Sequence, residues 1–299
     1  MIVNSRSVGF AVVALAYALA GAVALLVSWL MRAHHPLTVA FVADLAATVV
    51  VFALSTVVAN ASLYDPYWSV APPVIVLAWI GTGPSGVDGV RQFLVAAVTL
   101  VWAVRLTGNW AWGWSGLAQE DWRYVQIREQ TAGRVPWWLV NFTGIQLMPT
   151  LVVFAGLLAA WPAVGVPNRG VNWLDGLAVA VALGATAIEA VADLQLRGFA
   201  RDPNHRGRIA DTGLWRYSRH PNYLGEILFW WGIWLFALAA APGWWWTVVG
   251  PLAMVVLFVF VSVPLMDKRS LARRPAYEEH MRRVPALLPV PGRRAARQN

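Results

Sequence analysis

Five polar side chains recur at helical spacing in two neighbouring apolar segments. Glu189, Asp193 and Arg197 stand four residues apart, so they share one face of a predicted helix. Asn222 and Glu226 repeat this spacing at the start of the next apolar segment. Ionisable groups at the end of a membrane span are costly to bury and are usually functional. Salt-bridged helix caps would explain one such residue, whereas five converging groups favour a polar pocket that opens to one side of a membrane.

The segment 201–226, which joins these two helices, is rich in residue types that bind phosphate. It contains five Arg, two His and two Tyr in 26 residues. Arginine presents a planar fork of donors that matches phosphate oxygens, while Tyr and His can contact a base or a ribose. The segment therefore predicts binding of an anionic, phosphorylated ligand. A surface for lipid headgroups is the alternative, although it would need only the charge.

The composition indicates which kind of element must position these residues. Of 299 residues, 59% are hydrophobic and only 13% are charged, whereas a soluble domain has about 25% charged residues. This apolar content excludes a disordered chain. The absence of Cys excludes a disulfide-stapled domain, a thiolate nucleophile and a Cys-based metal site. His34, His35 and His280 have no neighbouring residues of metal-ligand type, so we expect no metal site.

Eight apolar blocks approach or reach the length that crosses a bilayer, which is about 20 helical residues. The blocks are Val8–Met31, Leu37–Ala59, Tyr67–Gly83, Val90–Thr107, Pro136–Ala163, Val171–Asp193, Asn222–Ala240 and Trp244–Met266. The third block is short and contains Pro72 and Pro73, so it could be bent or re-entrant. We expect residues 1–299 to form one all-α, membrane-embedded bundle of seven or eight transmembrane helices.

The basic residues fall on one side of the membrane if the blocks alternate in direction. The N-terminal tail, the connections 60–66, 105–135 and 194–220, and the tail from residue 267 hold 20 of the 23 Lys and Arg residues. The positive-inside rule then places both termini and the two long loops in the cytoplasm, which suggests the inner membrane of a bacterium. Topogenesis and attraction to anionic headgroups would also account for this charge.

The connecting segment carries a family resemblance. Its motif is Gly213-Leu-Trp-Arg-Tyr-Ser-Arg-His-Pro-Asn-Tyr-Leu-Gly-Glu226, which is preceded by Glu189-Ala-Val-Ala-Asp193 and followed by Tyr277 and Leu288-Pro289. This pattern resembles the C-terminal domain of the steroid 5-alpha-reductase superfamily. The motifs Tyr64-Asp-Pro-Tyr-Trp-Ser69, Arg105-Leu-Thr-Gly-Asn-Trp110 and Glu120-Asp-Trp-Arg-Tyr124 are similar to its bacterial branch of uncharacterised function. The Arg219-His-Pro core is also shared with isoprenylcysteine carboxyl methyltransferases, which use S-adenosylmethionine.

The resemblance implies that the two helices, their connecting loop and the basic tail hold NADPH. The residues at or near the matching positions are Glu189, Asp193, Arg197, Arg201, Arg208, Tyr217, Arg219, His220, Asn222, Tyr223, Glu226, Arg269 and Tyr277. Glu189 stands where the steroid enzymes have Asn, and the tail residues align only with gaps. Several Arg would offset the pyrophosphate and the 2′-phosphate of this cofactor. The resemblance therefore divides the chain into a cofactor-binding half, residues 136–299, and a substrate side, residues 1–135.

The implied reaction is transfer of a hydride to the β-carbon of a conjugated C=C bond in an apolar enone. In the steroid enzymes an acid residue and a Tyr hold the substrate carbonyl. Asp65 falls near the acidic position, with Tyr64 and Tyr67 as phenolic donors beside it. The partner Tyr is absent from the fourth block, where Arg105 and Asn109 stand instead. A polyprenoid, quinone-like or fatty enone therefore fits as well as a steroid.

Several of these residues also have a purely structural interpretation. Asp65 could belong to a plain turn, and Arg105 could be a topogenic anchor. Asp121 and Arg123 lie in a loop, where they and Glu120 could simply pair with Arg128 or Arg134. Asp44 lies within a block and has no evident partner.

Three functions from different classes are compatible with the sequence. The first is an NADPH-dependent membrane reductase of lipid metabolism, the second is an S-adenosylmethionine-dependent methyltransferase, and the third is a non-enzymatic lipid-binding protein. The expected partners are membrane lipids and an apolar, lipid-like small-molecule substrate, without nucleic acid. The stretch Gly81-Thr-Gly-Pro-Ser-Gly86 fits the dinucleotide motif G-x-G-x-x-G, but it follows an apolar helix and not a strand, so we expect a turn.

Overall fold

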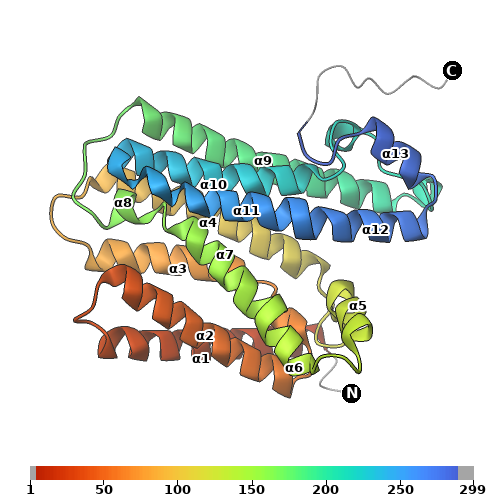
Figure 1. Cartoon of the computed structure of the whole chain (residues 1–299), viewed down its shortest axis with the longest axis horizontal. Coiled ribbons are helices and arrows are strands. Elements are labelled where there is room, and N and C mark those ends of the chain that lie inside the picture. Colours follow the sequence, from red (N-terminus) through yellow and green to blue (C-terminus); the bar gives the residue numbers. More distant parts are fainter. Residues whose placement is uncertain (1–4, 289–299) are drawn as a thin grey trace.

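The computed structural model describes residues 5–288, which form helices joined by turns, with no strand among them. Seven helical segments are long and apolar enough to cross a membrane. They are α1 (Arg6–Leu30), α2 (Pro36–Val57), α4 (Gly89–Gly113), α6 to α7 (Trp137–Leu157), α9 (Trp173–Arg201), α10 (Pro221–Ala240) and η6 to α12 (Pro242–Arg273). The protein is an integral membrane protein built as a multi-span helical bundle, as the sequence predicted (Figure 1).

Shorter elements complete the described part of the chain. They are η2 (Ala61–Tyr64), α3 (Tyr67–Thr82), α5 (Trp122–Thr131), α8 (Trp161–Val164), η4 (Pro203–His205), η5 (Gly213–Arg216) and α13 (Tyr277–Arg283). Two spans change their winding along their length. The first consists of α6 (Trp137–Val140), η3 (Asn141–Leu147) and α7 (Met148–Leu157), and the second of η6 (Pro242–Val248), α11 (Val249–Leu257), η7 (Phe258–Ser262) and α12 (Val263–Arg273). Both η3 and η7 are π-helical.

Helix α3 corresponds to the short third block of the sequence. Its 16 residues span about 24 Å, which is less than the roughly 30 Å of a bilayer core. It continues as one helix through Pro72 and Pro73, so the re-entrant alternative is not found. Figure 1 shows it lying beside the longer helices of the bundle.

Two helices extend well beyond the apolar blocks that predicted them. Helix α4 continues past Thr107 to Gly113, and α9 continues past Asp193 to Arg201. Hydropathy marks where the bilayer ends, whereas a helix ends where its last carbonyl groups find other partners. Polar residues such as Arg and Gln are also good helix formers, so they prolong the helix into water.

The connection between α2 and α3 folds into the bundle and does not lie on its surface. All four residues of η2 are buried, and the side chain of Leu63 is 0% exposed. Asn60 holds this inward turn, because its side-chain amide donates to the carbonyl oxygens of Leu117 (2.8 Å) and Gln119 (3.0 Å). Its carboxamide oxygen accepts from the backbone N–H of Ser62 at 2.9 Å. Tyr64 and Asp65 are thereby carried into the interior.

The turns that carry most basic residues gather at one end of the bundle. Figure 1 shows α5, α13 and the first turns of α1 and α10 at this end, which we call the basic end. Three residues of the basic tail, Arg293, Arg294 and Arg297, lie outside the described residues. The Gly81–Gly86 stretch forms the last turn of α3 and the bend after it, with a helix and not a strand before it.

At the opposite end, Arg91 is fully buried and does not face water. Its Nε and Nη2 atoms donate to the carboxylate of Asp175 at 2.7 and 2.8 Å, and both side chains are 0% exposed. Asn168 Oδ1 and the carbonyl oxygens of Arg169 and Gly170 accept from the same guanidinium. This pair ties the start of α4 to the start of α9.

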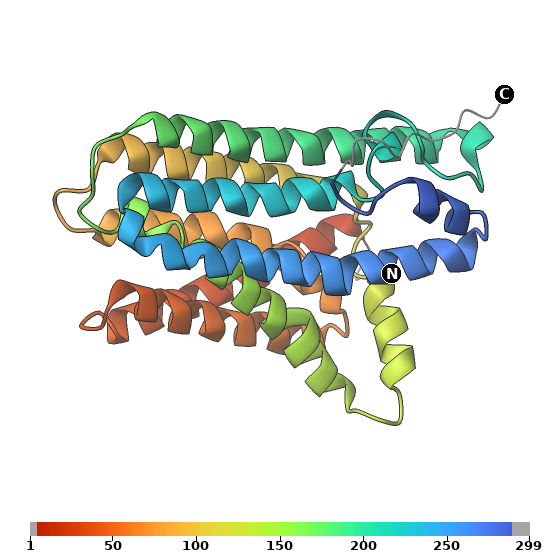
Figure 2. The same ribbon diagram turned by 45° about the horizontal axis from the view of Figure 1, so that its top comes forward.

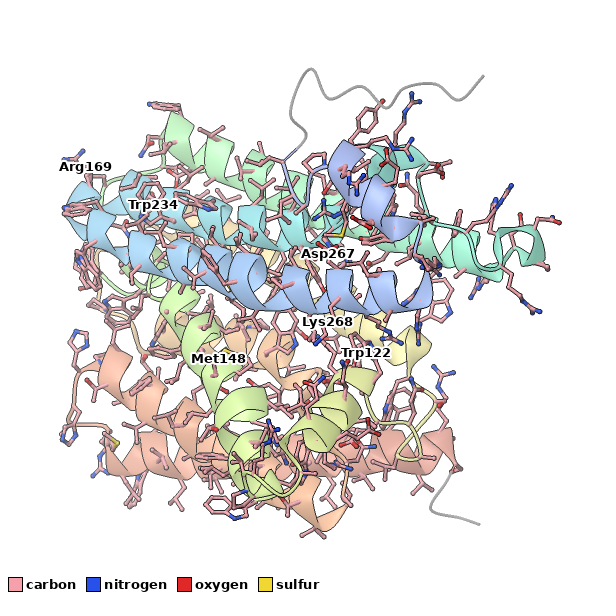
Figure 3. All side chains as sticks on the ribbon, turned by 45° about the vertical axis from the view of Figure 1, so that its right-hand side comes forward. Trp122, Met148, Arg169, Trp234, Asp267 and Lys268 are labelled. Carbon is pink, nitrogen blue, oxygen red and sulfur yellow. The ribbon has the colours of Figure 1, made fainter. Side chains whose placement is uncertain are left out.

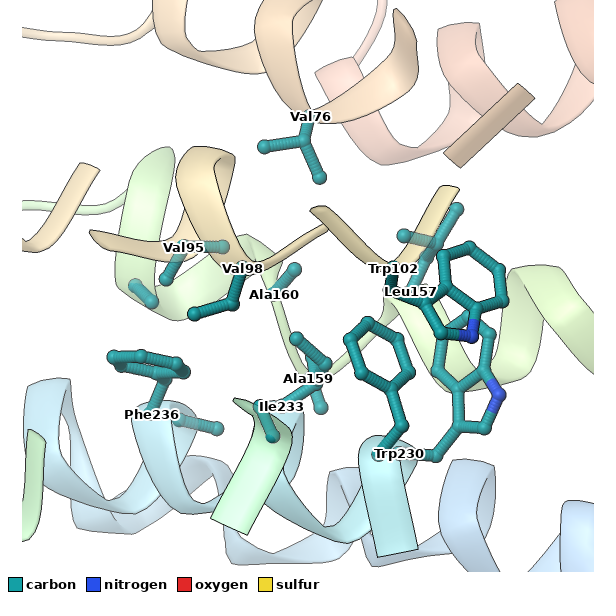
Figure 4. Packing of buried hydrophobic residues seen from close by; sticks show 14 of the residues in the cluster. Val76, Val95, Val98, Trp102, Leu157, Ala159, Ala160, Trp230, Ile233 and Phe236 are labelled. Atoms are coloured by element: carbon teal, nitrogen blue, oxygen red, sulfur yellow. The ribbon is translucent and has the colours of Figure 1, made fainter. Parts of the chain in front are cut away.

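The core between α4, α7, α9 and α10 is built from aromatic and small side chains (Figure 4). Trp102 stacks on Phe229 with ring centroids 4.6 Å apart, and it meets Trp230 edge-on at 5.4 Å. Stacked and edge-on pairs of this kind stabilise a core beyond the area that they bury. These rings also separate the core from the polar cavity described below.

Candidate functional site

One cavity at the basic end brings together half of the residues that the sequence selected. Its volume is about 490 Å³, and its walls come from η2, α3, α4, α5, α7, α9, α10 and the last membrane span. The selected residues that line it are Tyr64, Asp65, Arg105, Asn109, Glu189, Asp193, Asn222, Tyr223 and Glu226. A volume of this order is typical of small-molecule sites, which measure about 300–1,000 Å³.

The inner wall of the cavity holds a charged cluster. The guanidinium of Arg105, on α4, donates one hydrogen bond to Glu189 and another to Asp193, both on α9. Asn222 of α10 donates from Nδ2 to Asp193 Oδ1 at 3.2 Å. The spacing of four residues along α9 therefore does place Glu189 and Asp193 on one face, and Arg105 is the group that this face meets.

Glu226 lies deeper and is held by the core aromatics. Its two carboxylate oxygens accept from Trp102 Nε1 at 3.0 Å and from Trp230 Nε1 at 2.9 Å. Glu189 packs against the preceding residue, since a Cβ atom on Gly225 would lie only 2.5 Å from Glu189 Cγ, and the carboxyl groups of Glu189 and Glu226 are close enough to interact. Oε1 of Glu189 is buried and has no hydrogen-bond partner among the described residues. Such an acceptor at a cavity wall can bind an N–H or O–H group of a ligand.

A second cluster forms the outer wall and comes from residues far apart in sequence. The hydroxyl of Tyr124, on α5, donates to Asp65 Oδ1 at 2.6 Å. Arg123 pairs with Asp121 through two hydrogen bonds of 2.9 and 3.0 Å. Burial raises the pKa of Asp65 from 3.8 to about 7, although the Arg123 charge and the Tyr124 hydrogen bond both lower it. Asp65 can therefore be a protonated, hydrogen-bond-donating acid near neutral pH.

Tyr124 is a cavity residue that our reading of the sequence did not select as a site residue. It is the last residue of the Glu120-Asp-Trp-Arg-Tyr124 motif, which was the available signal. Trp68, Trp122 and Met148 also line the cavity and were not selected. They could not be found from spacing, because helix packing alone decides which of many aromatic and apolar residues face the cavity.

Tyr64 and Tyr67, the other candidates near Asp65, are bound within the bundle. The hydroxyl of Tyr64 shares a hydrogen bond with Thr150 Oγ1 at 2.8 Å, although its ring still lines the cavity. The hydroxyl of Tyr67 donates to Asp44 Oδ1 at 2.7 Å, and Tyr67 lies outside the cavity lining. Asp44 therefore has a partner after all, and Tyr67 is placed to stabilise this buried carboxyl group.

Asn109, Arg197 and Arg201 lie where the cavity meets the basic end. Nη2 of Arg197 donates to the carbonyl oxygen of Asn109 at 2.7 Å and to its side-chain oxygen at 2.6 Å. The guanidinium groups of Arg197 and Arg201 lie 4.5 and 5.4 Å from the ring centroid of Trp112. Arg197 and Arg201 are thus near the cavity without lining it.

Arg219, His220 and Tyr277 converge on a carboxylate and do not reach the cavity. Nη2 of Arg219 donates to Asp267 Oδ2 at 2.7 Å. The ring Nε2 of His220 and the hydroxyl of Tyr277 each lie 2.9 Å from Asp267 Oδ1. Nη1 of Arg219 also donates to the carbonyl oxygen of Val284 at 2.6 Å. In this arrangement the three residues fasten the C-terminal segment to α10 and α12.

The three remaining candidates, Arg208, Tyr217 and Arg269, lie in different places. Arg208 lines a second cavity of about 470 Å³ with His205 and Arg274, beyond the end of α9. Tyr217 is 59% exposed. The guanidinium of Arg269 lies 3.6 Å from the ring centroid of Trp122, whose side chain lines the main cavity. Among the described residues, no three His, Asp, Glu or Cys side chains are grouped closely enough to hold a metal ion.

Fold and site together define a class: a multi-span helical membrane protein with a partly charged cavity, shared by both halves of the chain, at its basic end. The sequence model of the family described as "Protein of unknown function (DUF1295)" matches residues 51–284. The chain therefore belongs to this family. It is 27% identical over 266 residues to "Uncharacterized protein C594.04c" of Schizosaccharomyces pombe, an alignment that covers 80% of this chain and 76% of the relative. No solved structure matches the chain.

Proposed function

We propose that this protein is an NADPH-dependent membrane reductase that reduces the C=C bond of an apolar enone. The observation that carries the proposal is the shared cavity. It joins the acid candidate Asp65, from the first half of the chain, to the cofactor candidates Glu189, Asp193 and Asn222, from the second half. The resemblance to the steroid 5-alpha-reductase superfamily assigned these two groups to one reaction.

The groups at the inner wall fit the carboxamide end of a nicotinamide cofactor. Oε1 of Glu189, to which no N–H or hydroxyl group of the described residues donates, can accept a hydrogen bond from an amide NH2 group. Arg197, Arg201 and, farther out, Arg208 supply positive charge along the side of α9 that leads to the basic end, where the phosphates would lie. When bound, NADPH supplies the hydride for the reaction.

Asp65 is the proposed acid. As hydride reaches the β-carbon of the enone, negative charge develops on the carbonyl oxygen, and a donor there stabilises it. Protonated Asp65 can donate to this oxygen, while the hydroxyl of Tyr124 fixes the orientation of the carboxyl group at 2.6 Å. Tyr124 thus takes the place of the Tyr that the fourth helix lacks.

The basic end is proposed to face the cytoplasm, because the positive-inside rule orients membrane proteins by such asymmetry. The cofactor would then reach the cavity from the cytoplasm. The apolar substrate would reach it from the bilayer, in agreement with a function in lipid metabolism.

The proposal is tested by ligand-induced thermal stabilisation of the detergent-purified protein. We expect NADPH to raise the unfolding temperature and S-adenosylmethionine to leave it unchanged. In Asn222→Ala, the NADPH concentration needed for the same rise in unfolding temperature should be at least tenfold higher, because each lost charge-assisted contact contributes about 1.5 kcal/mol or more. Asn204→Ala, in the loop beyond α9 and outside the cavity lining, is the matched control.

Two results would contradict the proposal. Stabilisation by S-adenosylmethionine alone would favour the methyltransferase alternative. Stabilisation by none of NADPH, NADH and S-adenosylmethionine would favour a lipid-binding protein without enzymatic activity.

A further inference from the structure

The two spans that flank the cavity pack closely at one end and then diverge. Helices α7 and α11 touch at Gly156 and Gly250, where a Cβ atom on Gly250 would lie 2.7 Å from Gly156 Cα and 2.4 Å from the carbonyl oxygen of Ala155. This contact leaves no room for a side chain. Toward the basic end, Figure 2 shows the α6–α7 span turning away from α11 and α12. The two spans therefore form a V with its apex at the glycine contact.

Both arms of the V are π-helical where they pass the cavity. Residues of η3 and η7 line it from opposite sides, with Gly144 and Ile145 on one arm and Phe258, Val261 and Ser262 on the other. A π-helical turn widens the helix and shifts the side chains that follow it, and such turns are frequent at functional sites. Between the arms, the cavity is thus bounded by side chains of these two turns and of the adjoining turns of α7, α11 and α12.

The surface around the gap is apolar and exposed. Leu151 on one arm is 40% exposed, and Val261 and Phe260 on the other are 48% and 72% exposed. In a membrane-spanning bundle such residues face acyl chains. The gap between the arms therefore faces the bilayer and not water.

The other side of α7 is closed. Its neighbour there is α2, and the seam is held by a hydrogen bond of 2.8 Å from Gln146 Nε2 to Ser55 Oγ and by a contact of 3.0 Å between the hydroxyl groups of Thr48 and Thr150. These side chains are buried and hydrogen-bonded across the seam, so separating them would cost free energy. A lateral opening is consequently confined to the V.

Helix α5 spans the wide end of the V. The guanidinium of Arg128 lies 4.3 Å from the Trp137 ring at the start of one arm, and Arg269 of α12 lies 3.6 Å from the Trp122 ring of α5. Figure 3 shows Trp122 near Lys268 of α12, with Met148 on α7. Two cation–π contacts thus hold α5 between the arms, where it separates the gap from the water at the basic end.

We propose that the gap between η3 and η7 is a lateral window through which a single apolar chain passes from the bilayer into the cavity. The identity of the molecule that uses the window rests on the proposed function, whereas the window itself does not. Gly144 lines the cavity at this point, and a Cβ atom there would have no other atom within 4 Å. A large side chain at this position therefore starts in open space, and we expect it to obstruct the gap.

The absence of native Cys allows a direct test in vesicles. Leu106, on α4 and in the cavity wall, is replaced by Cys and labelled with bimane. Phosphatidylcholine with brominated acyl chains quenches the label from the bilayer, and iodide quenches it from water. Leu183→Cys, on the exposed face of α9, is the lipid-facing reference. We expect brominated lipid to quench the label at position 106 strongly and iodide to quench it weakly.

Gly144→Trp is the decisive variant. It should reduce quenching at position 106 by more than half and leave quenching at position 183 unchanged. Gly184→Trp is the matched control, since Gly184 also has no atom within 4 Å of a built Cβ and lies on α9 away from the cavity. If Gly144→Trp lowers the unfolding temperature, Val261→Trp on the opposite arm replaces it.

Three results would overturn the window. The first is quenching of the label at position 106 by iodide but not by brominated lipid. The second is unchanged brominated-lipid quenching at position 106 in both Gly144→Trp and Val261→Trp. The third is an equal loss of this quenching in Gly184→Trp. None of these measurements uses NADPH or substrate. If the quenching results support the window but NADPH does not bind, the proposed function alone is refuted. If NADPH binds but the quenching results contradict the window, the window alone is refuted.

Discussion

The titration of Asp65 gives a prediction that needs no knowledge of the substrate. Because burial raises its pKa to about 7, about nine in ten of these carboxyl groups are protonated at pH 6 and about one in ten at pH 8. If protonated Asp65 is the acid, the reductase rate falls about tenfold over this range. In Asp65→Asn this pH dependence disappears together with the proton that the carboxyl group supplies.

Infrared difference spectroscopy can follow this proton directly. The difference between the wild-type and Asp65→Asn spectra isolates the carbonyl stretch of one protonated carboxyl group among several buried ones. We expect this band to vanish with a midpoint near pH 7. Tyr124→Phe and Arg123→Gln should each move the midpoint upward, because both partners lower the pKa of Asp65 in the wild type. Asp88→Asn, on a carboxylate at the other end of the bundle, should leave it unchanged.

The same group has a defined effect on stability. Its folded-state pKa lies above its unfolded value of 3.8, so the folded state binds the proton more tightly between pH 4 and pH 7. Stability therefore falls as pH rises through this range, by at most about 4 kcal/mol, and is constant above it. Asp65→Asn should flatten this dependence. A midpoint near pH 4, or no band assigned to Asp65, would refute the reasoning.

Three other substitutions test contacts that hold the site in place. Asp175→Asn leaves the buried guanidinium of Arg91 without its carboxylate, so we expect a loss of about 3–5 kcal/mol and a lower unfolding temperature in detergent; the exposed Arg169→Gln should have no such effect. Gly250→Leu forces α7 and α11 apart, with an expected cost of about 1–3 kcal/mol or more in the same assay. Asp267→Asn removes the anchor of the C-terminal segment, and trypsin should then cleave this segment faster, whereas an unchanged rate would contradict the anchoring role.

The sequence predicted the helices well because each membrane-spanning helix is marked by its own run of apolar residues. It placed their ends less well. Helix α9 runs on to Arg201 because its polar continuation still forms helix in water. The inward fold of η2 was also unexpected, since a short connection without Lys or Arg between two spans gives no sign of its depth. Asn60, whose side chain makes three hydrogen bonds within that turn, is the feature that decides it.

The sequence predicted which site residues share the face of a single helix. It did not predict the contacts between site residues of different helices. The spacing of Glu189 and Asp193 fixed their common face, but not that Arg105 of another helix would join them. Arg219 and His220 looked equally suitable for a phosphate, yet they point to Asp267. A helix face is a local property, whereas the partner of that face depends on how the helices pack.

By itself the amino-acid sequence determined that this chain is a helical membrane protein with its charge concentrated at one end, because hydropathy and charge are properties of single segments. It also determined which polar residues share a helix face. Only the tertiary structure decided that Asp65 meets Tyr124, that Asp65 and several of the cofactor candidates line one cavity, and that two of the spans flanking this cavity diverge. These features depend on distances between residues far apart in the chain, which packing sets and local sequence does not.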